Sequence, residues 1–464
     1  MLPEQYELQI RKGGLYLSAW PDSRSVTRKI VGIEAEKPGL LVCTVQRFGG
    51  AAGRLSLLDL AHPRSSGRLK RGDRGSFAEG FRLMLNRQFP GWEVRRLSSE
   101  MSLAQSFSPV YPRALLKRGS SQIAAMACPG VMDEHRLLSF ALLWHDYVCG
   151  SAANRDRVPL ALFLPEHAGN TTALRLKWLR VPARIFLFNS DGSAGEVDIA
   201  DLGNMSTKVA PRHQLTHFSP TLRNLLSELR AKYDIETVDD PDGSLSLRSS
   251  GLEFGRVRDG RLFVGMEEKR TYVDGESGGI EALARELSAI RGTEKTNQNH
   301  PLYRAHPELW LESAVRKNLG TVDAALESRP LLGQVITFAG GDRDIIDLLG
   351  ASGEGRIAVL ELKASEDIHL PLQALDYWMR ADWHLKAGEL DGFFPEVSLS
   401  RRSPRLLLIA PGVRFHSSNE TVLSYFAKDI ETERVGLNLE WQQGLKVVFR
   451  LRGYEKPQSQ RSSL

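Results

Sequence analysis

Residues 341–363 read GDRDIIDLLGASGEGRIAVLELK, and the rest of the chain is interpreted outward from them. Two apolar runs, IIDLL and IAVLEL, flank a Gly-, Ser- and Glu-containing turn, which is typical of two β-strands joined by a hairpin. Side chains alternate between the faces of a strand, so Glu361 and Lys363 project from the same face. Buried charges are costly unless they are paired or bind an ion. Because Asp347 on the neighbouring strand supplies a second carboxylate, the hairpin predicts a divalent-metal site with a lysine beside it.

Two predicted helices add polar side chains to this hairpin. Residues 306–319 read HPELWLESAVRKNL, with Pro near the start, and predict a short helix that carries Glu312 in its middle. The later run LPLQALDYWM places Gln373 and Tyr377 four residues apart, hence on one helical face. The order along the chain is therefore a helix with Glu, a strand with Asp, a strand with Glu-x-Lys, and a helix with Gln-x-x-x-Tyr.

In this order the motifs resemble those of the PD-(D/E)XK nuclease superfamily, particularly its NucS-like and RecB-type branches. The resemblance covers roughly residues 300–415 and implies a restriction-endonuclease-like fold, with a central mixed sheet flanked by helices. One departure is that Ile346, and not Pro, precedes the Asp, which leaves the chemistry intact. An ordinary β-hairpin with a surface Glu/Lys pair is the alternative to this interpretation.

The resemblance also implies roles for individual residues. Asp347 and Glu361 are expected to bind Mg²⁺ or Mn²⁺, with Glu312 supporting the metal. Lys363 is expected to orient or deprotonate the attacking water. Gln373 and Tyr377 of the last motif are expected to brace the site or the scissile phosphate.

Length and composition set the broad class of the chain. At 464 residues it predicts two or three domains, and 42% hydrophobic with 25% charged residues is ordinary for a soluble protein. The sequence has neither a run of eighteen apolar residues nor the pattern of a signal peptide, so we expect no membrane partner and a cytoplasmic location. The three cysteines, Cys43, Cys128 and Cys149, have apolar neighbours and are expected to pack as small hydrophobic residues.

The predicted fold class is α/β (α+β) with several domains. A β-rich unit at 1–75 precedes an α/β domain at 76–214 and an α+β connecting module with a linker at 215–299. The nuclease-like domain follows at 300–454, and 455–464 is expected to be a disordered tail.

The order of predicted elements in 76–190 repeats that of the nuclease-like part. We therefore consider that this segment is a degenerate second copy of the same fold, although an unrelated α/β domain of similar size is the alternative. Superimposing Ile123-Ala-Ala-Met on Ile357-Ala-Val-Leu places Ala127 and Pro129 at the positions of Glu361 and Lys363. By this alignment the metal ligands are absent from the first copy. The neighbouring His145 and Asp146 diverge on a helix and are expected to be structural.

The net charge of +5 is modest, and its positive surplus lies before residue 301. Lys and Arg attract phosphate backbones, so the N-terminal part is expected to contribute to nucleic-acid binding, with an ordinary solvated surface as the alternative. The candidate phosphate contacts lie in two basic loops: Arg68, Lys70 and Arg71, and Arg401, Arg402 and Arg405.

These observations predict a metal-dependent DNA endonuclease whose N-terminal region contributes DNA binding or dimerisation, for example in DNA repair or defence. Two alternatives stay open. One is a nucleic-acid-binding or regulatory protein of nuclease fold that needs a partner for activity. The other is an RNA-directed nuclease, because motifs that address phosphate do not discriminate the sugar or the base.

Overall fold

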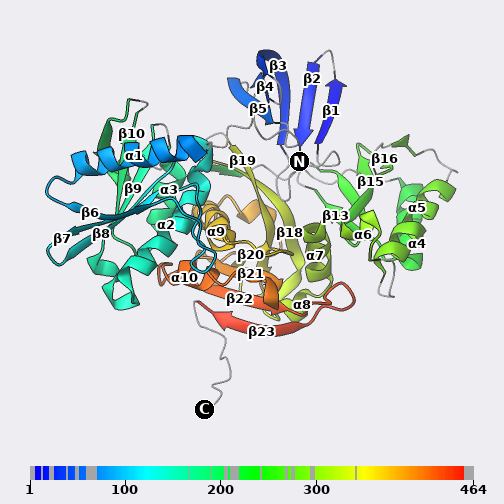
Figure 1. Ribbon diagram of the computed structural model, residues 1–464. Helices are drawn as coiled ribbons and strands as arrows, with labels where there is room; N and C mark the ends of the chain where they lie inside the picture. Colours follow the sequence, from blue (N-terminus) through cyan, green and yellow to red (C-terminus); the bar gives the residue numbers. More distant parts are fainter. Residues whose placement is uncertain are drawn as a thin grey trace.

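A computed structural model gives the fold (Figure 1). It describes residues 6–11, 14–19, 26–37, 40–46, 52–58, 71–166, 168–189, 191–202, 207–209, 219–240, 243–266, 270–272, 277–292, 298–339 and 342–453. Within these ranges the strands form four sheets, so the protein is a mixed α/β protein, as predicted. The predicted tail at 455–464 lies outside the described residues, and none of the described helices is both long and apolar enough to cross a membrane.

The N-terminal sheet is an antiparallel meander, as the alternating pattern predicts. The side chains of Leu17, Val42 and Val45 are buried, whereas Ile10 and Ile33 are exposed. The strands are β1 (Tyr6–Arg11), β2 (Gly14–Ala19), β3 (Val26–Lys37), β4 (Leu40–Gln46) and β5 (Ala52–Leu58).

The second sheet belongs to a unit that we call lobe one, residues 71–197. Its strands are ordered β11-β10-β9-β8-β7-β6. The prediction that Arg71 lies in a basic loop is wrong, because α1 already begins at this residue. The elements are α1 (Arg71–Gln88), β6 (Glu93–Ser98), β7 (Arg113–Arg118), β8 (Ser121–Ala127), α2 (Glu134–Cys149), β9 (Leu160–Pro165), α3 (Asn170–Leu176), β10 (Ala183–Phe188) and β11 (Ala194–Val197).

The third sheet belongs to lobe two, residues 307–453, and its order is β12-β18-β19-β20-β21-β22-β23. Its edge strand β12 (Thr207–Val209) comes from the segment expected to end the preceding domain. The other elements are α7 (Pro307–Lys317), α8 (Leu319–Val322), β18 (Leu326–Ala339), β19 (Asp342–Ser352), β20 (Ile357–Leu362), α9 (Leu370–Lys386), β21 (Arg405–Pro411), α10 (Asn419–Leu423), β22 (Thr432–Leu437) and β23 (Val447–Arg452).

Apart from the additional edge strand β12 of lobe two, the two lobes have the same sheet topology. In lobe one, β6, β7 and β8 are antiparallel neighbours, β8, β9 and β10 are parallel, and β11 returns antiparallel. In lobe two, β18, β19 and β20 are antiparallel, β20, β21 and β22 are parallel, and β23 returns antiparallel. Each lobe places a helix before its first strand and one helix in each parallel crossover.

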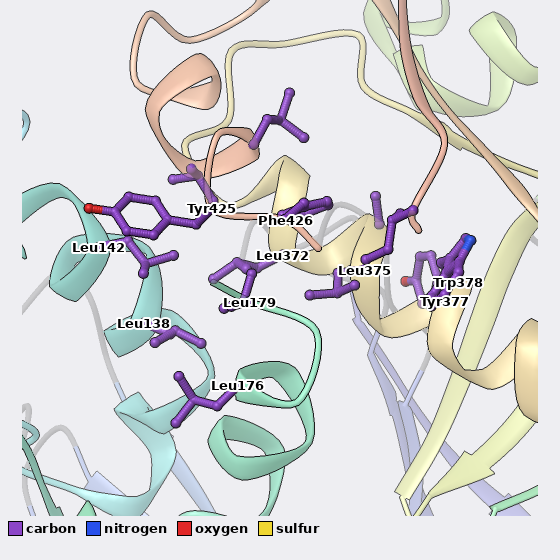
Figure 2. Packing of buried hydrophobic residues seen from close by; sticks show 14 of the residues in the cluster. Leu138, Leu142, Leu176, Leu179, Leu372, Leu375, Tyr377, Trp378, Tyr425 and Phe426 are labelled. Atoms are coloured by element: carbon purple, nitrogen blue, oxygen red, sulfur yellow. The ribbon is translucent and has the colours of Figure 1, made fainter. Parts of the chain in front are cut away.

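One hydrophobic cluster joins the lobes. It contains residues of α2, α3, α9 and α10 together with the sheet residues beneath them. Figure 2 shows side chains of both lobes gathered in this cluster, among them Leu138, Leu179, Leu372 and Phe426. The lobes are therefore halves of one folded body and not beads on a flexible linker.

The fourth sheet forms a small module beside lobe two (Figure 1). Gly251 allows this module to approach lobe two closely, because a Cβ at this residue would collide with the carbonyl of Leu309 in α7. The φ of Gly251, +81°, also favours glycine. The elements are α4 (Pro220–Lys232), β13 (Glu236–Asp239), β14 (Leu245–Ser249), β15 (Leu252–Arg258), β16 (Arg261–Val264), β17 (Arg270–Thr271) and α5 (Ser277–Arg291), followed by α6 (Pro301–Arg304).

Candidate active site

The predicted hairpin is present as β19 and β20, and its register brings the two acids together. Leu348 pairs with Leu360, so the next cross-strand position places Asp347 opposite Glu361 on one face of the sheet. Asp347 Oδ2 accepts a hydrogen bond from the Leu362 backbone N–H at 3.2 Å. β20 lies between β19 and β21 with both faces covered, so Glu361 is fully buried, whereas Asp347 is half-buried.

Lys363 lies on the same face, at the end of β20. Its Nζ is 4.0 Å from Glu361 Oε1, and its backbone N–H donates to the Ile409 carbonyl at 3.0 Å. Burial acts to lower the pKa of Lys363, but the carboxylates of Glu361, Glu308 and Asp347 outweigh burial and raise the pKa above its ordinary value. The amine is therefore a cation at neutral pH.

For Asp347, in contrast to Lys363, the effect of burial on the pKa outweighs that of the neighbouring charge and hydrogen bond. Burial raises the pKa of Asp347 to about 6, and the charge of Glu312 acts in the same direction. The Leu362 hydrogen bond and the Lys363 ammonium act against this rise without cancelling it. A carboxyl group with such a pKa gains most from a nearby cation, because a positive charge favours its ionised form.

Glu312 projects from the middle of α7, as predicted, and is buried. Its Oε1 is 2.9 Å from the Arg316 guanidinium and 4.0 Å from Nη1 of Arg248 in the connecting module. Among the described residues, no three His, Cys, Asp or Glu side chains form a group that could hold a metal ion. The role of Glu312 as a metal ligand thus stays a prediction, and its carboxylate is held by arginines here.

The predicted pair on α9 is in contact. Gln373 Nε2 donates to Tyr377 Oη at 3.2 Å, as expected for residues four apart on a helix. Tyr377 is buried and Gln373 is half-buried. Trp378 anchors the same helix, since its indole N–H donates to the Pro404 carbonyl at 2.8 Å.

The basic loop before β21 lies at the other end of the strands. Arg405 pairs in register with Ala358, three residues before Glu361, which is about 10 Å along the strand. Its guanidinium forms ion pairs with Asp323 and Glu433, at 2.7 and 3.4 Å.

The other predicted phosphate contacts are placed as follows. Arg401 pairs with Asp391 and Arg402 with Glu431, and both arginines are largely exposed. Arg68 and Lys70 lie outside the described residues, and Arg71 is the first residue of α1. Nucleic-acid contact by these residues stays a prediction.

Sequence reasoning missed the arginines that surround Glu312. Arg316 follows it by four residues, which is the spacing of an ion pair on one helical face, so this partner could have been inferred. Arg248 lies 64 positions earlier in the chain and carries no local signal.

His145 is structural, as expected. Its Nδ1 is 2.7 Å from the Tyr425 hydroxyl and its Nε2 is 2.6 Å from the Val158 carbonyl, so it links lobe one to lobe two inside the core. Asp146 pairs with Arg155. The three cysteines, Cys43, Cys128 and Cys149, are free and buried.

Comparison with known proteins adds no relative to this description. No family model matches the sequence, and no curated protein matches it.

Proposed function

We propose that this protein is a divalent-metal-dependent nuclease that hydrolyses phosphodiester bonds in DNA, and that lobe two has the restriction-endonuclease-like fold. The observation that supports the proposal is the pair Asp347 and Glu361, opposite each other on adjacent strands with the ammonium of Lys363 beside them. An ordinary surface Glu/Lys pair would not be buried in a central strand, because burying charges without a function costs stability.

The donor set fits Mg²⁺ or Mn²⁺. Hard cations prefer oxygen ligands, and Mg²⁺ is usually bound through one or two carboxylates while water and substrate phosphate complete its shell. Asp347 and Glu361 provide such a pair, and because burial raises the pKa of Asp347, a bound cation would stabilise its ionised form. In this proposal Asp347 and Glu361 hold the ion, and the arginine-bound Glu312 acts through its charge on Asp347.

Each polar residue of the site then has a defined task. A bound divalent ion would supply polarisation of the phosphate and a lower pKa for an attacking water. Lys363, as a cation, would donate to a phosphate oxygen or to the water and stabilise the negative charge that develops during attack. The Gln373–Tyr377 pair would brace α9 against the site.

Cleavage assays on purified protein test this proposal. Single-stranded DNA, double-stranded DNA and RNA would be incubated with Mg²⁺, with Mn²⁺ and with EDTA. We expect DNA cleavage that requires the metal and is lost in Glu361→Gln, while the exposed Glu440→Gln variant cleaves like the parent.

Other outcomes would overturn the proposal in distinct ways. Cleavage in EDTA would contradict the metal requirement, and cleavage of RNA alone would make the protein an RNA-directed nuclease. Binding of DNA without cleavage under either metal would favour a nucleic-acid-binding protein that depends on a partner.

A further inference from the structure

Hydrogen bonds of the two sheets define which residues of the lobes are equivalent. The Cys128 N–H donates to the Phe163 carbonyl at 2.8 Å, and the Lys363 N–H donates to the Ile409 carbonyl at 3.0 Å. The two bonds join equivalent strands, β8 with β9 in lobe one and β20 with β21 in lobe two. Each bond lies one residue after the last paired position of its two strands. Cys128 is therefore the counterpart of Lys363.

This equivalence corrects the alignment made from sequence. Superposition on Ile123 and Ile357 assigns Ala127 to Glu361, but the hydrogen bonds assign Met126 to Glu361 and Arg113, which pairs with Met126, to Asp347. Burial agrees, because Met126 lies in the core shared with lobe two and Ala127 lies in a cluster on the opposite face of the sheet. A slip by one residue exchanges the two faces of a strand, which is why the sequence alignment failed.

Lobe one thus carries a cation where lobe two carries an acid. Arg113 is buried, with its Nη2 donating to the Glu100 carbonyl at 2.7 Å and its guanidinium 4.5 Å from the Phe107 ring centre. The remaining counterparts, Met126 and Cys128, are uncharged side chains in the core. A fixed guanidinium repels a divalent cation, so lobe one cannot reproduce the metal site.

The lobes meet through equivalent segments, the turns that follow α3 and α10. The Arg180 N–H donates to the Tyr425 carbonyl at 2.6 Å, and the Ala427 N–H donates to the Trp178 carbonyl at 2.8 Å. Exchanging 178 with 425 and 180 with 427 converts one bond into the other.

The bridge between Leu179 and Phe426 lies between these two bonds. The turns themselves share geometry, since the Leu179 N–H donates to the Leu176 carbonyl and the Phe426 N–H to the Leu423 carbonyl. Self-exchanging contacts of this kind characterise a two-fold interface.

We infer that the chain is an internal pseudo-dimer in which lobe one occupies the place of a second nuclease subunit, and that it cuts one strand of a DNA duplex per encounter. This rests on the proposed nuclease function. The two strands of a duplex run antiparallel, so a two-fold protein with two centres would present one centre to each strand. With Arg113 in lobe one, only lobe two presents a centre, and the product is a nick.

The reaction at that centre is simple hydrolysis. The oxygen of water forms a new bond to phosphorus, one phosphorus–oxygen ester bond breaks, and the proton released by the water ends on the leaving oxygen. The complementary strand stays intact.

Supercoiled plasmid distinguishes a nick from a double-strand break. With Mg²⁺ or Mn²⁺ and substoichiometric protein, we expect nicked circles first, linear plasmid only after a lag, and a rate proportional to protein concentration. The chain should sediment as a monomer under the same conditions. Ser121→Ala, an exposed change at the start of β8, should leave this course unchanged, and Glu361→Gln should abolish it.

Other results of these assays would overturn either the one-strand inference or the nuclease proposal. Linear plasmid appearing together with nicked circles, or a rate that rises with the square of protein concentration, would overturn the one-strand inference while leaving the nuclease function intact. Cleavage of single-stranded DNA with no effect on the plasmid would do the same. No cleavage of any nucleic acid would overturn the nuclease proposal itself.

Discussion

The two lobes share a strand order but carry different side chains at the position of the proposed active site. Lobe two has Asp347, Glu361 and Lys363 on two central strands, whereas lobe one has Arg113, Met126 and Cys128 at the positions that the backbone hydrogen bonds make equivalent. The scaffold accepts either set because the backbone makes its hydrogen bonds in both lobes regardless of the side chains. The fold itself therefore does not require carboxylates at this place.

The largest expected effect comes from giving lobe two the residue of lobe one. Glu361→Met should reduce cleavage on the order of 10³-fold or more, because the ion loses a ligand. The free energy of unfolding should fall as well, because the buried Lys363 ammonium loses the carboxylate that contributes most to its raised pKa. Cleavage rates and thermal unfolding of the variant measure both. Met126→Leu, the conservative change in lobe one, is the control, and retained cleavage in Glu361→Met would break the comparison.

The next effect concerns the interface between the lobes. Arg175 of α3 pairs with Asp376 of α9 at 2.7 Å, and both side chains are largely buried. Asp376→Ala should lower the free energy of unfolding by about 3–5 kcal/mol, because the guanidinium is left buried without its carboxylate. Urea unfolding measures it, and the double variant Arg175→Met with Asp376→Leu should recover most of the loss. Little loss in the single variant would show that this ion pair does not stabilise the contact between the lobes.

A smaller effect is expected from the pH dependence of Asp347. Its pKa of about 6 in the folded protein exceeds the ordinary value near 4. Between about pH 4 and about pH 6, the Asp347 carboxyl is ionised in the unfolded chain but still protonated in the folded protein. The free energy of unfolding therefore falls as pH rises, by at most about 3 kcal/mol and by less for a half-buried group. Asp347→Asn should therefore stabilise the protein by about 1–3 kcal/mol at pH 7 and hardly at pH 4.

Urea unfolding at both pH values, without divalent ions, measures the Asp347 effect. Saturating Mg²⁺ should stabilise the parent and not the variant, because ligands stabilise the state that binds them. Equal stabilisation by Asp347→Asn at pH 4 and pH 7 would contradict the raised pKa.

The smallest effect is expected at the exposed basic loop. Arg402→Ala should change stability by less than about 0.5 kcal/mol, since its ion pair with Glu431 is exposed. If this loop contacts phosphate, the variant should bind DNA more weakly at low salt, with a shallower salt dependence. Fluorescence anisotropy at several salt concentrations measures this, and an unchanged salt slope would remove the loop from the binding surface.

Much of lobe two was predictable from local patterns. The hairpin of β19 and β20 and the helix bearing Gln373 and Tyr377 follow from apolar periodicity and turn residues. Other elements could not be predicted from local patterns, because they depend on contacts with distant parts of the chain. The helix α10 ends at Leu423, because the chain turns there to contact lobe one, and β12 joins the sheet of lobe two from a distant segment.

The amino-acid sequence by itself determined which residue types are available for chemistry and the alternation that puts Glu361 and Lys363 on one face, because periodicity along a strand is a local property. Only the tertiary structure decided that Asp347 lies opposite Glu361, that Arg316 and Arg248 hold Glu312, and that Arg113 occupies the corresponding place in lobe one. These relations depend on strand register and on contacts between segments far apart in the chain. A shift of one residue in register is almost invisible in sequence, yet it moves every side chain to the other face of the sheet.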